Sequence, residues 1–80
     1  MASRYYFDLR NENGLIVDEI GEVQLHLSAV QDEAARSLAH LIQDAVRKST
    51  GAFTEMAIEV RDDDGPVMNA RFTLQVLRKN

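Results

Sequence analysis

The strongest pattern in the chain is a helical one, between residues 29 and 48. Apolar residues recur there every three or four positions, so on an α-helix they would share one arc of roughly 160°. The residues of this arc are Val30, Ala34, Ala35, Leu38, Leu41, Ile42, Ala45 and Val46. Ser28 and Gln31 have the spacing of a capping box, and Gly51 is placed to end the helix. We therefore expect a helix with one buried face and one solvated face.

Strand patterns flank this helix on both sides. Four stretches read as strands: the first is rich in strand-forming residue types, and apolar and polar residues alternate cleanly in the last two. These stretches are residues 4–10, 15–20, 54–61 and 67–78. The Asn13-Gly14 dipeptide between the first two is typical of a tight hairpin. The stretch 15–20, which Gly21 is expected to end, has apolar residues at both odd and even positions, so its inward face stays open and a bulge is allowed.

The turn between the last two strands fixes their register. A two-residue turn, Asp64-Gly65, would set Val60 opposite Asn69 and separate the apolar faces. A three-residue loop, Asp63-Asp64-Gly65, sets Val60 opposite Met68 instead. The same register pairs Ile58 with Ala70 and Met56 with Phe72. We therefore predict the three-residue loop.

Together these elements predict an α+β fold in one domain, residues 1–80. The expected architecture is a two-layer sandwich of the ββαββ type, in which one helix packs on a four-stranded, mainly antiparallel sheet. Phe7, Leu38 and Phe72 are expected to meet in its core. The pattern does not fix the order of the strands in the sheet.

Composition bounds the class of protein. The chain has 80 residues, 45% apolar and 28% charged, and it contains no cysteine, which excludes disulfides and thiolate chemistry. Nine Lys and Arg against thirteen Asp and Glu give a net charge of −4, which argues against a surface that seeks phosphates. The apolar stretches are too short to span a bilayer. We expect a cytoplasmic protein that does not contact a membrane.

The candidate catalytic and metal sites do not meet the requirements of known motifs. Asp62-Asp63-Asp64-Gly65 is similar to part of a calcium loop, but the alignment puts Val60 and Arg71 where acidic ligands are required. His26 and His40 lack the spacing of a metal site. The serines do not lie in a nucleophile elbow, and the glycines do not form a phosphate loop. We therefore expect no enzyme, no cofactor and no metal.

The sheet face turned away from the helix is the candidate interaction face. Its residues are Arg4, Tyr6, Arg61, Arg71 and Leu77. Acidic residues of the same strands share this face, and cross-strand ion pairs account for the mixture. An open sheet also has two edges that can add a strand from another chain. We expect an interaction module with a protein partner or a weak homodimer; the alternatives are a monomer and a nucleic-acid-associated regulatory protein.

Several short motifs carry a family resemblance. They are Tyr5-Tyr6-Phe7-Asp8-Leu9-Arg10, Asn13-Gly14, Asp18-Glu19-Ile20-Gly21, the helix alanines Ala34, Ala35 and Ala39, and Ala57-Ile58-Glu59-Val60-Arg61-Asp62 with Gly65. Through them nearly the whole chain resembles small uncharacterised proteins of soil alphaproteobacteria, of the rhizobial type, that are grouped as a domain of unknown function. The turn Asn11-Glu12-Asn13-Gly14 departs from this group, where more aspartate is expected. The resemblance implies a bacterial, cytoplasmic, stand-alone protein and assigns no catalytic or binding residue.

Overall fold

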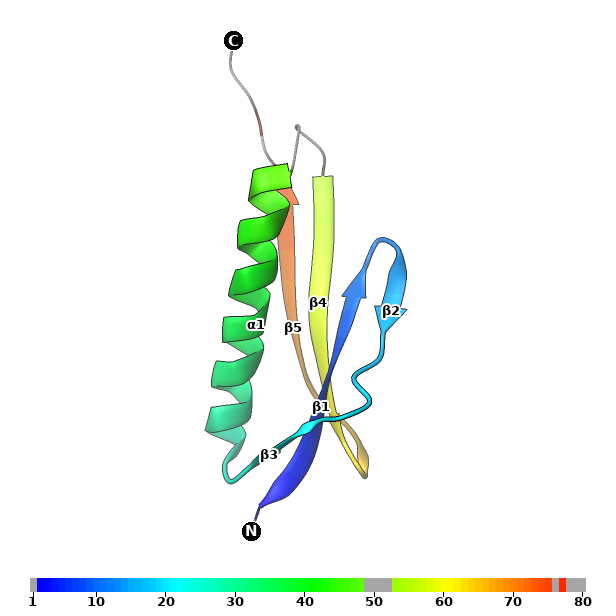
Figure 1. The fold of residues 1–80 in the computed structure, drawn as a ribbon, viewed down its shortest axis with the longest axis vertical. Coiled ribbons are helices and arrows are strands. Elements are labelled where there is room, and N and C mark those ends of the chain that lie inside the picture. Colours follow the sequence, from blue (N-terminus) through cyan, green and yellow to red (C-terminus); the bar gives the residue numbers. More distant parts are fainter. Residues whose placement is uncertain (1, 49–52, 76, 78–80) are drawn as a thin grey trace.

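The computed structural model describes residues 2–48, 53–75 and 77. In these residues one helix and five strands follow one another along the chain (Figure 1). Their bounds are β1 (Ser3–Asn11), β2 (Gly14–Ile16), β3 (Glu22–Gln24), α1 (Leu27–Lys48), β4 (Phe53–Asp62) and β5 (Gly65–Gln75). The fold is therefore α+β, as predicted, with one helix and an open antiparallel sheet.

The strands lie in the order β2-β1-β4-β5, so the two hairpins meet through β1 and β4. The register of this central pair sets Phe7 opposite Val60. β3 pairs with the beginning of β1, and β2 pairs with its end. The stretch predicted as one strand over residues 15–20 is thus divided. β2 covers only its beginning, residues 17–21 leave the ladder, and β3 adds a fifth strand that the sequence pattern did not predict.

β4 and β5 form a long hairpin that keeps the predicted register over most of its length. The predicted pairs of Val60, Ile58 and Met56 with Met68, Ala70 and Phe72 are present. Nearer the turn, Arg61 lies opposite Pro66, which makes Val67 the extra residue of a bulge. The turn has two residues, Asp63-Asp64, so the predicted three-residue loop is wrong. A bulge tolerates Pro66, because proline has no N–H to donate to a regular ladder.

Both hairpin turns have the same construction. The strand residue before each two-residue turn, Asn11 or Asp62, accepts a hydrogen bond through its side chain from the backbone N–H two residues later, at 2.8 Å. The strand residues that follow the turns, Gly14 and Gly65, have φ angles of 121° and 125°. Asn13 has no positive φ, so the glycine of the Asn13-Gly14 dipeptide alone supplies the unusual conformation.

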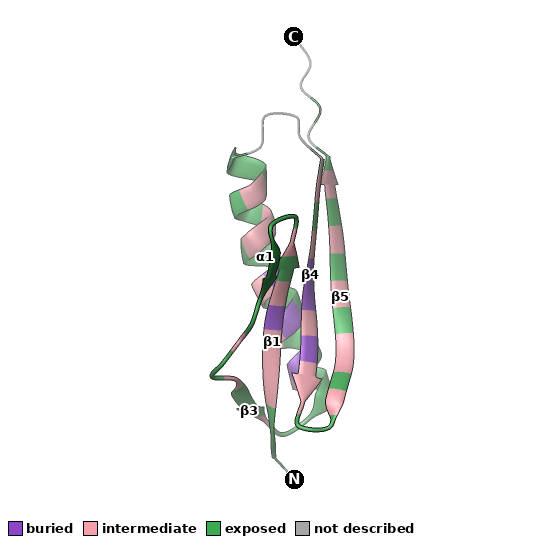
Figure 2. Ribbon diagram, turned by 90° about the vertical axis from the view of Figure 1, so that its right-hand side faces the viewer, coloured by how far each residue is buried: buried purple, intermediate pink, exposed green. Residues whose placement is uncertain are grey.

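The core lies between α1 and the middle of the sheet, and buried residues are seen in both α1 and β4 (Figure 2). Its buried cluster consists of Val30, Ala34, Leu38, Ile58 and Val60. Phe7 and Phe72 pack against this cluster, which confirms the predicted association of both rings with Leu38. Ala35 and Val46 are exposed, so the predicted apolar arc was too wide. The single sheet covers a part of the helix surface that is narrower than the predicted arc of apolar residues.

α1 begins earlier than predicted. The backbone N–H groups of Ala29 and Val30 donate to the carbonyl of His26, at 3.1 and 3.3 Å. Ser28 therefore lies inside the first helical turn, and its prediction as the N-cap is wrong. Gly51, which was expected to end the helix, and residues 76 and 78 of the last predicted strand lie outside the described residues.

Candidate functional site

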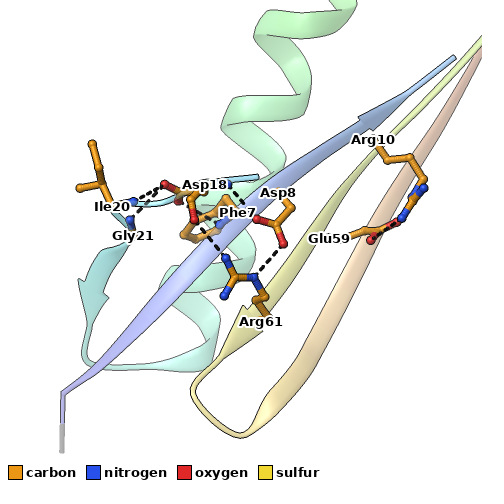
Figure 3. Close-up of polar contacts among 8 residues, drawn as sticks. All are labelled: Phe7, Asp8, Arg10, Asp18, Ile20, Gly21, Glu59 and Arg61. Carbon is orange, nitrogen blue, oxygen red and sulfur yellow. Dashed lines mark hydrogen bonds and ion pairs between the residues drawn. The ribbon is translucent and has the colours of Figure 1, made fainter. Parts of the chain in front are cut away.

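A cluster of polar side chains lies on the sheet face turned away from α1 (Figure 3). Its members are Tyr6, Asp8, Asp18 and Arg61, and we call it the Asp8 cluster. Asp8 is only 5% exposed. Its carboxylate accepts hydrogen bonds from Nε of Arg61 and from the backbone N–H of Asp18, both at 2.9 Å. Nη2 of Arg61 donates to the carbonyl of Asp18 at 3.0 Å, so β1, β4 and residues 17–21 are joined in one network.

The Asp18 carboxylate takes the place of a strand beside the middle of β1. It accepts hydrogen bonds from the backbone N–H groups of Phe7 and Ile20, both at 3.1 Å, and of Gly21, at 3.0 Å. Burial opposes its ionisation, but these N–H groups and the charge of Arg61 outweigh burial and hold the pKa of Asp18 below its ordinary value. A side chain thereby satisfies the backbone where β2 and β3 do not reach.

Gly21 completes this turn. Its φ angle is 73°, and a Cβ atom there would lie 2.9 Å from the carbonyl oxygen of Tyr5 and from the ring of Tyr6. Any other residue would be strained and would collide with β1. The sequence pattern was interpreted as a strand ended by Gly21 and did not predict the joint role of Asp18 and Gly21. The available signal was an aspartate followed three residues later by a glycine, which is typical of a side-chain-capped turn.

Two residues of the predicted interaction face, Arg4 and Arg61, hold the same segment, and a third, Tyr6, lies against Arg61. The guanidinium carbon of Arg61 lies 4.4 Å from the centre of the Tyr6 ring, and the two residues are paired across β1 and β4. The bond to Asp8 raises the pKa of Arg61 further above its ordinary value, so this side chain stays charged. Nη1 of Arg4 donates to the carbonyl of Ile20 at 2.9 Å. Arg4 and Arg61 therefore hold residues 17–21 through backbone carbonyls instead of forming a free cationic patch.

Arg71 and Leu77 lie apart from the Asp8 cluster. Arg71 belongs to a row that crosses the sheet through Ala57 to Arg10. Ala57 is buried within this row, although the alternation placed it on the solvated face. Arg10 forms an ion pair with Glu59, and the hydrogen bond of that pair raises the pKa of Arg10. Leu77 follows the end of β5 and is exposed. The five predicted residues therefore do not form one site.

Two depressions lie over β1, β4 and β5. One, of about 240 Å³, is lined in part by Arg10, Glu55 and Arg71. The other, of about 340 Å³, is lined in part by Asp8 and Arg61. Their ionisable groups are carboxylates and guanidiniums, and no side chain in them could serve as a serine, cysteine or lysine nucleophile. In each depression a guanidinium forms an ion pair with a carboxylate of the sheet.

Exposed aliphatic side chains follow one another along residues 15–27, the segment that contains β2, β3 and the beginning of α1. They are between 42% and 80% exposed, and we call them the apolar edge: Leu15, Ile16, Val17, Ile20, Val23, Leu25 and Leu27. A strand with one inward face would bury alternate members of such a series. The signal was present in the sequence, since the apolar residues of the stretch 15–20 occupy both odd and even positions. The apolar edge was nevertheless not predicted as exposed.

Within the described ranges, no three histidine, aspartate or glutamate side chains come together as ligands for a metal ion. In the same part of the chain, no helix has the length and apolar character needed to cross a bilayer.

Comparison with known proteins places the chain in a family. No curated protein and no solved structure matches the chain. A family described as a domain of unknown function, DUF6894, matches residues 4–73. The match includes the Asp8 cluster and the apolar edge. The chain therefore belongs to the DUF6894 family.

Proposed function

We propose that this protein is a non-enzymatic interaction module that binds a basic protein partner through the apolar edge. The apolar edge is the observation that carries the proposal. Among the described residues, seven of the nine large apolar side chains that are exposed lie between Leu15 and Leu27. Exposure of so many large apolar side chains within one short segment of a small protein is characteristic of a binding site.

The apolar edge is held in a fixed conformation, which supports the proposal. Asp18 fastens residues 17–21 through three backbone hydrogen bonds. Arg4 and Arg61 each donate to a backbone carbonyl of the same segment. A surface that is ordered before binding loses less conformational entropy when its partner arrives. The Asp8 cluster therefore has a role in presenting the apolar side chains outward.

The charges around the apolar edge select the partner. Glu12, Glu19 and Glu22 are exposed, and residues 11–27 contain no lysine or arginine. Arg4 reaches the segment from β1, and the balance stays acidic. A partner with a basic rim around apolar side chains would be attracted, whereas nucleic acid or a second apolar edge would be repelled.

The nucleic-acid alternative has less support. Arg10 and Arg61 are engaged by Glu59 and Asp8. The ring of Tyr6 lies against Arg61 instead of being free to stack on a base. Binding to single strands relies on free cations and on open aromatic rings.

The test is capture with matched variants of the full chain. Ile20 and Leu25 are changed together to serine, and Leu77→Ser serves as the control because Leu77 is exposed but lies outside the apolar edge. Proteins that each form retains from an extract of the source cells are identified, purified and titrated by calorimetry. We expect a basic protein that binds wild type and control equally and the double variant at least about tenfold more weakly. Equal binding to all three forms, or no retained protein, contradicts the proposal.

A further inference from the structure

The two edges of the sheet differ in length. One edge consists of β2 and β3, with three residues each, whereas β5 at the other edge has eleven and pairs only with β4 in the part of the chain that the structure describes. Natural proteins keep edge strands short, bent or charged, because unpaired backbone groups can add a strand from another chain. β5 is protected near its turn by Pro66 and by the bulge at Val67. Residues 69–75 beyond the bulge form a regular edge strand.

The outward backbone groups of β5 follow from the registers. The N–H of Phe7 donates to Asp18, away from β4. Backbone groups alternate in direction along antiparallel strands, so the observed registers turn those of the even-numbered residues of β5 toward β4. The residues of the regular stretch whose backbone groups point away from the sheet are Asn69, Arg71, Thr73 and Gln75.

One register pairs all four of these residues between two copies of the chain. It is antiparallel and centred on Phe72, the middle of the stretch 69–75. It sets Asn69 of one copy opposite Gln75 of the other, and Arg71 opposite Thr73. Because the pair is symmetric, each of these contacts occurs twice. A centre at Arg71 would set Gln75 against the bulge, and a centre at Thr73 would set Asn69 beyond the end of the strand.

The side chains suit the same register. On the face that carries α1, Phe72 meets Phe72 of the second copy, and Ala70 meets Leu74. All three residues are only half-buried in the single chain, so pairing can bury them further. On the other face Arg71 meets Thr73, so like charges do not oppose one another. A centre at Arg71 would set two guanidiniums together. The register also keeps apolar faces aligned, which leaves both helices on one side of a continuous sheet.

We infer that two copies of this chain form a symmetric dimer through β5 in the register centred on Phe72. The dimer rests on the proposed function in that the protein acts as an interaction module, but it uses the sheet edge across from the apolar edge. The contact consists of one short strand pair and one row of apolar side chains. This is smaller than a standard interface, so we expect a dissociation constant on the order of micromolar.

Charge changes at Thr73 test this register, because Thr73 is exposed and faces Arg71 of the second copy. Thr73→Arg sets two arginines together at two symmetric places, and Thr73→Glu sets a carboxylate opposite each arginine. The controls Gln43→Arg and Gln43→Glu make the same charge changes at an exposed position of α1. Sedimentation equilibrium of the full chain measures the dissociation constant, and thermal melting checks that each variant folds.

We expect the wild type to dimerise reversibly. Thr73→Arg should raise the dissociation constant about tenfold, and Thr73→Glu should lower it at least about threefold. Both Gln43 controls should have dissociation constants within about twofold of the wild-type value. A monomer at every concentration up to about 1 mM overturns the dimer, and so does a dimer that responds equally to the Thr73 and Gln43 changes. Neither result affects partner capture by the apolar edge. Loss of that capture in turn leaves the sedimentation result intact, so the two failures are distinguishable.

Discussion

Replacing Asp18 by alanine leaves three backbone N–H groups without their acceptor. A hydrogen bond to a charged group contributes about 1.5–3 kcal/mol, and less where water can replace the acceptor. The bond from Ile20 is exposed, whereas those from Phe7 and Gly21 are partly buried. We therefore expect Asp18→Ala to lower the free energy of unfolding by about 2–4 kcal/mol. Asp18→Asn keeps one acceptor oxygen and should cost about half as much.

The effect of Asp18 should depend on pH in one direction. Its pKa is lower in the folded chain than its ordinary value, because backbone N–H groups and Arg61 outweigh the burial that opposes ionisation. The stabilisation is therefore fully present above the pKa of an unfolded aspartate, about 3.9, and is lost as the pH falls through the folded pKa. The difference in unfolding free energy between wild type and Asp18→Asn should stay constant from about pH 8 to about pH 5 and shrink below about pH 4.

Urea unfolding followed by far-UV circular dichroism measures both effects. Glu19→Ala is the control, since Glu19 is the adjacent carboxylate and is exposed. It should change the free energy of unfolding by no more than about 0.5 kcal/mol. If Asp18→Ala costs no more than Glu19→Ala, Asp18 does not replace a strand partner. A wild type to Asp18→Asn difference that persists unchanged at about pH 2 would refute the role of the ionised carboxylate.

Two further substitutions test the turn and the core. Gly21→Ala should lower the free energy of unfolding by about 2–4 kcal/mol, because the φ angle of Gly21 is 73° and the new Cβ would lie 2.9 Å from a backbone carbonyl of β1. An unchanged melting temperature would show that the turn has another conformation. Leu38→Ala should cost about 2–5 kcal/mol, because Leu38 belongs to the buried cluster. Exposed Leu77→Ala should cost no more than about 0.5 kcal/mol in the same urea titration, and equal losses would place Leu38 outside the core.

The regular elements could be predicted because each leaves a periodic signal in the sequence. The spacing of Val30, Ala34 and Leu38 indicates a helix face, and these three residues are the buried ones of α1. The register of β4 and β5 could be predicted because only one pairing of Val60 joins two apolar faces. Alternation does not show where the extra residue of the hairpin lies, so the bulge at Val67 was assigned to the loop.

The Asp8 cluster leaves no periodic signal. Asp18 substitutes for a strand through its side chain, so residues 17–21 interrupt the alternation that would have predicted β3. Ala57 lies at a position that alternation assigns to solvent, but it is buried in the row that joins Arg10 and Arg71. Arg10 and Arg71 line the same depression as Ala57, and the stems of such long side chains can cover a small neighbour. Such contacts follow from strand order, which the sequence pattern did not fix.

The central claim is that a protein partner binds the apolar edge. Hydrogen–deuterium exchange of the full chain, alone and with the basic protein that it captures, tests the claim most directly. We expect new protection in residues 14–27, around β2, β3 and the beginning of α1, and no change over most of α1. Protection confined to the face with Arg10 and Arg71, or to the solvated face of α1, would contradict the claim.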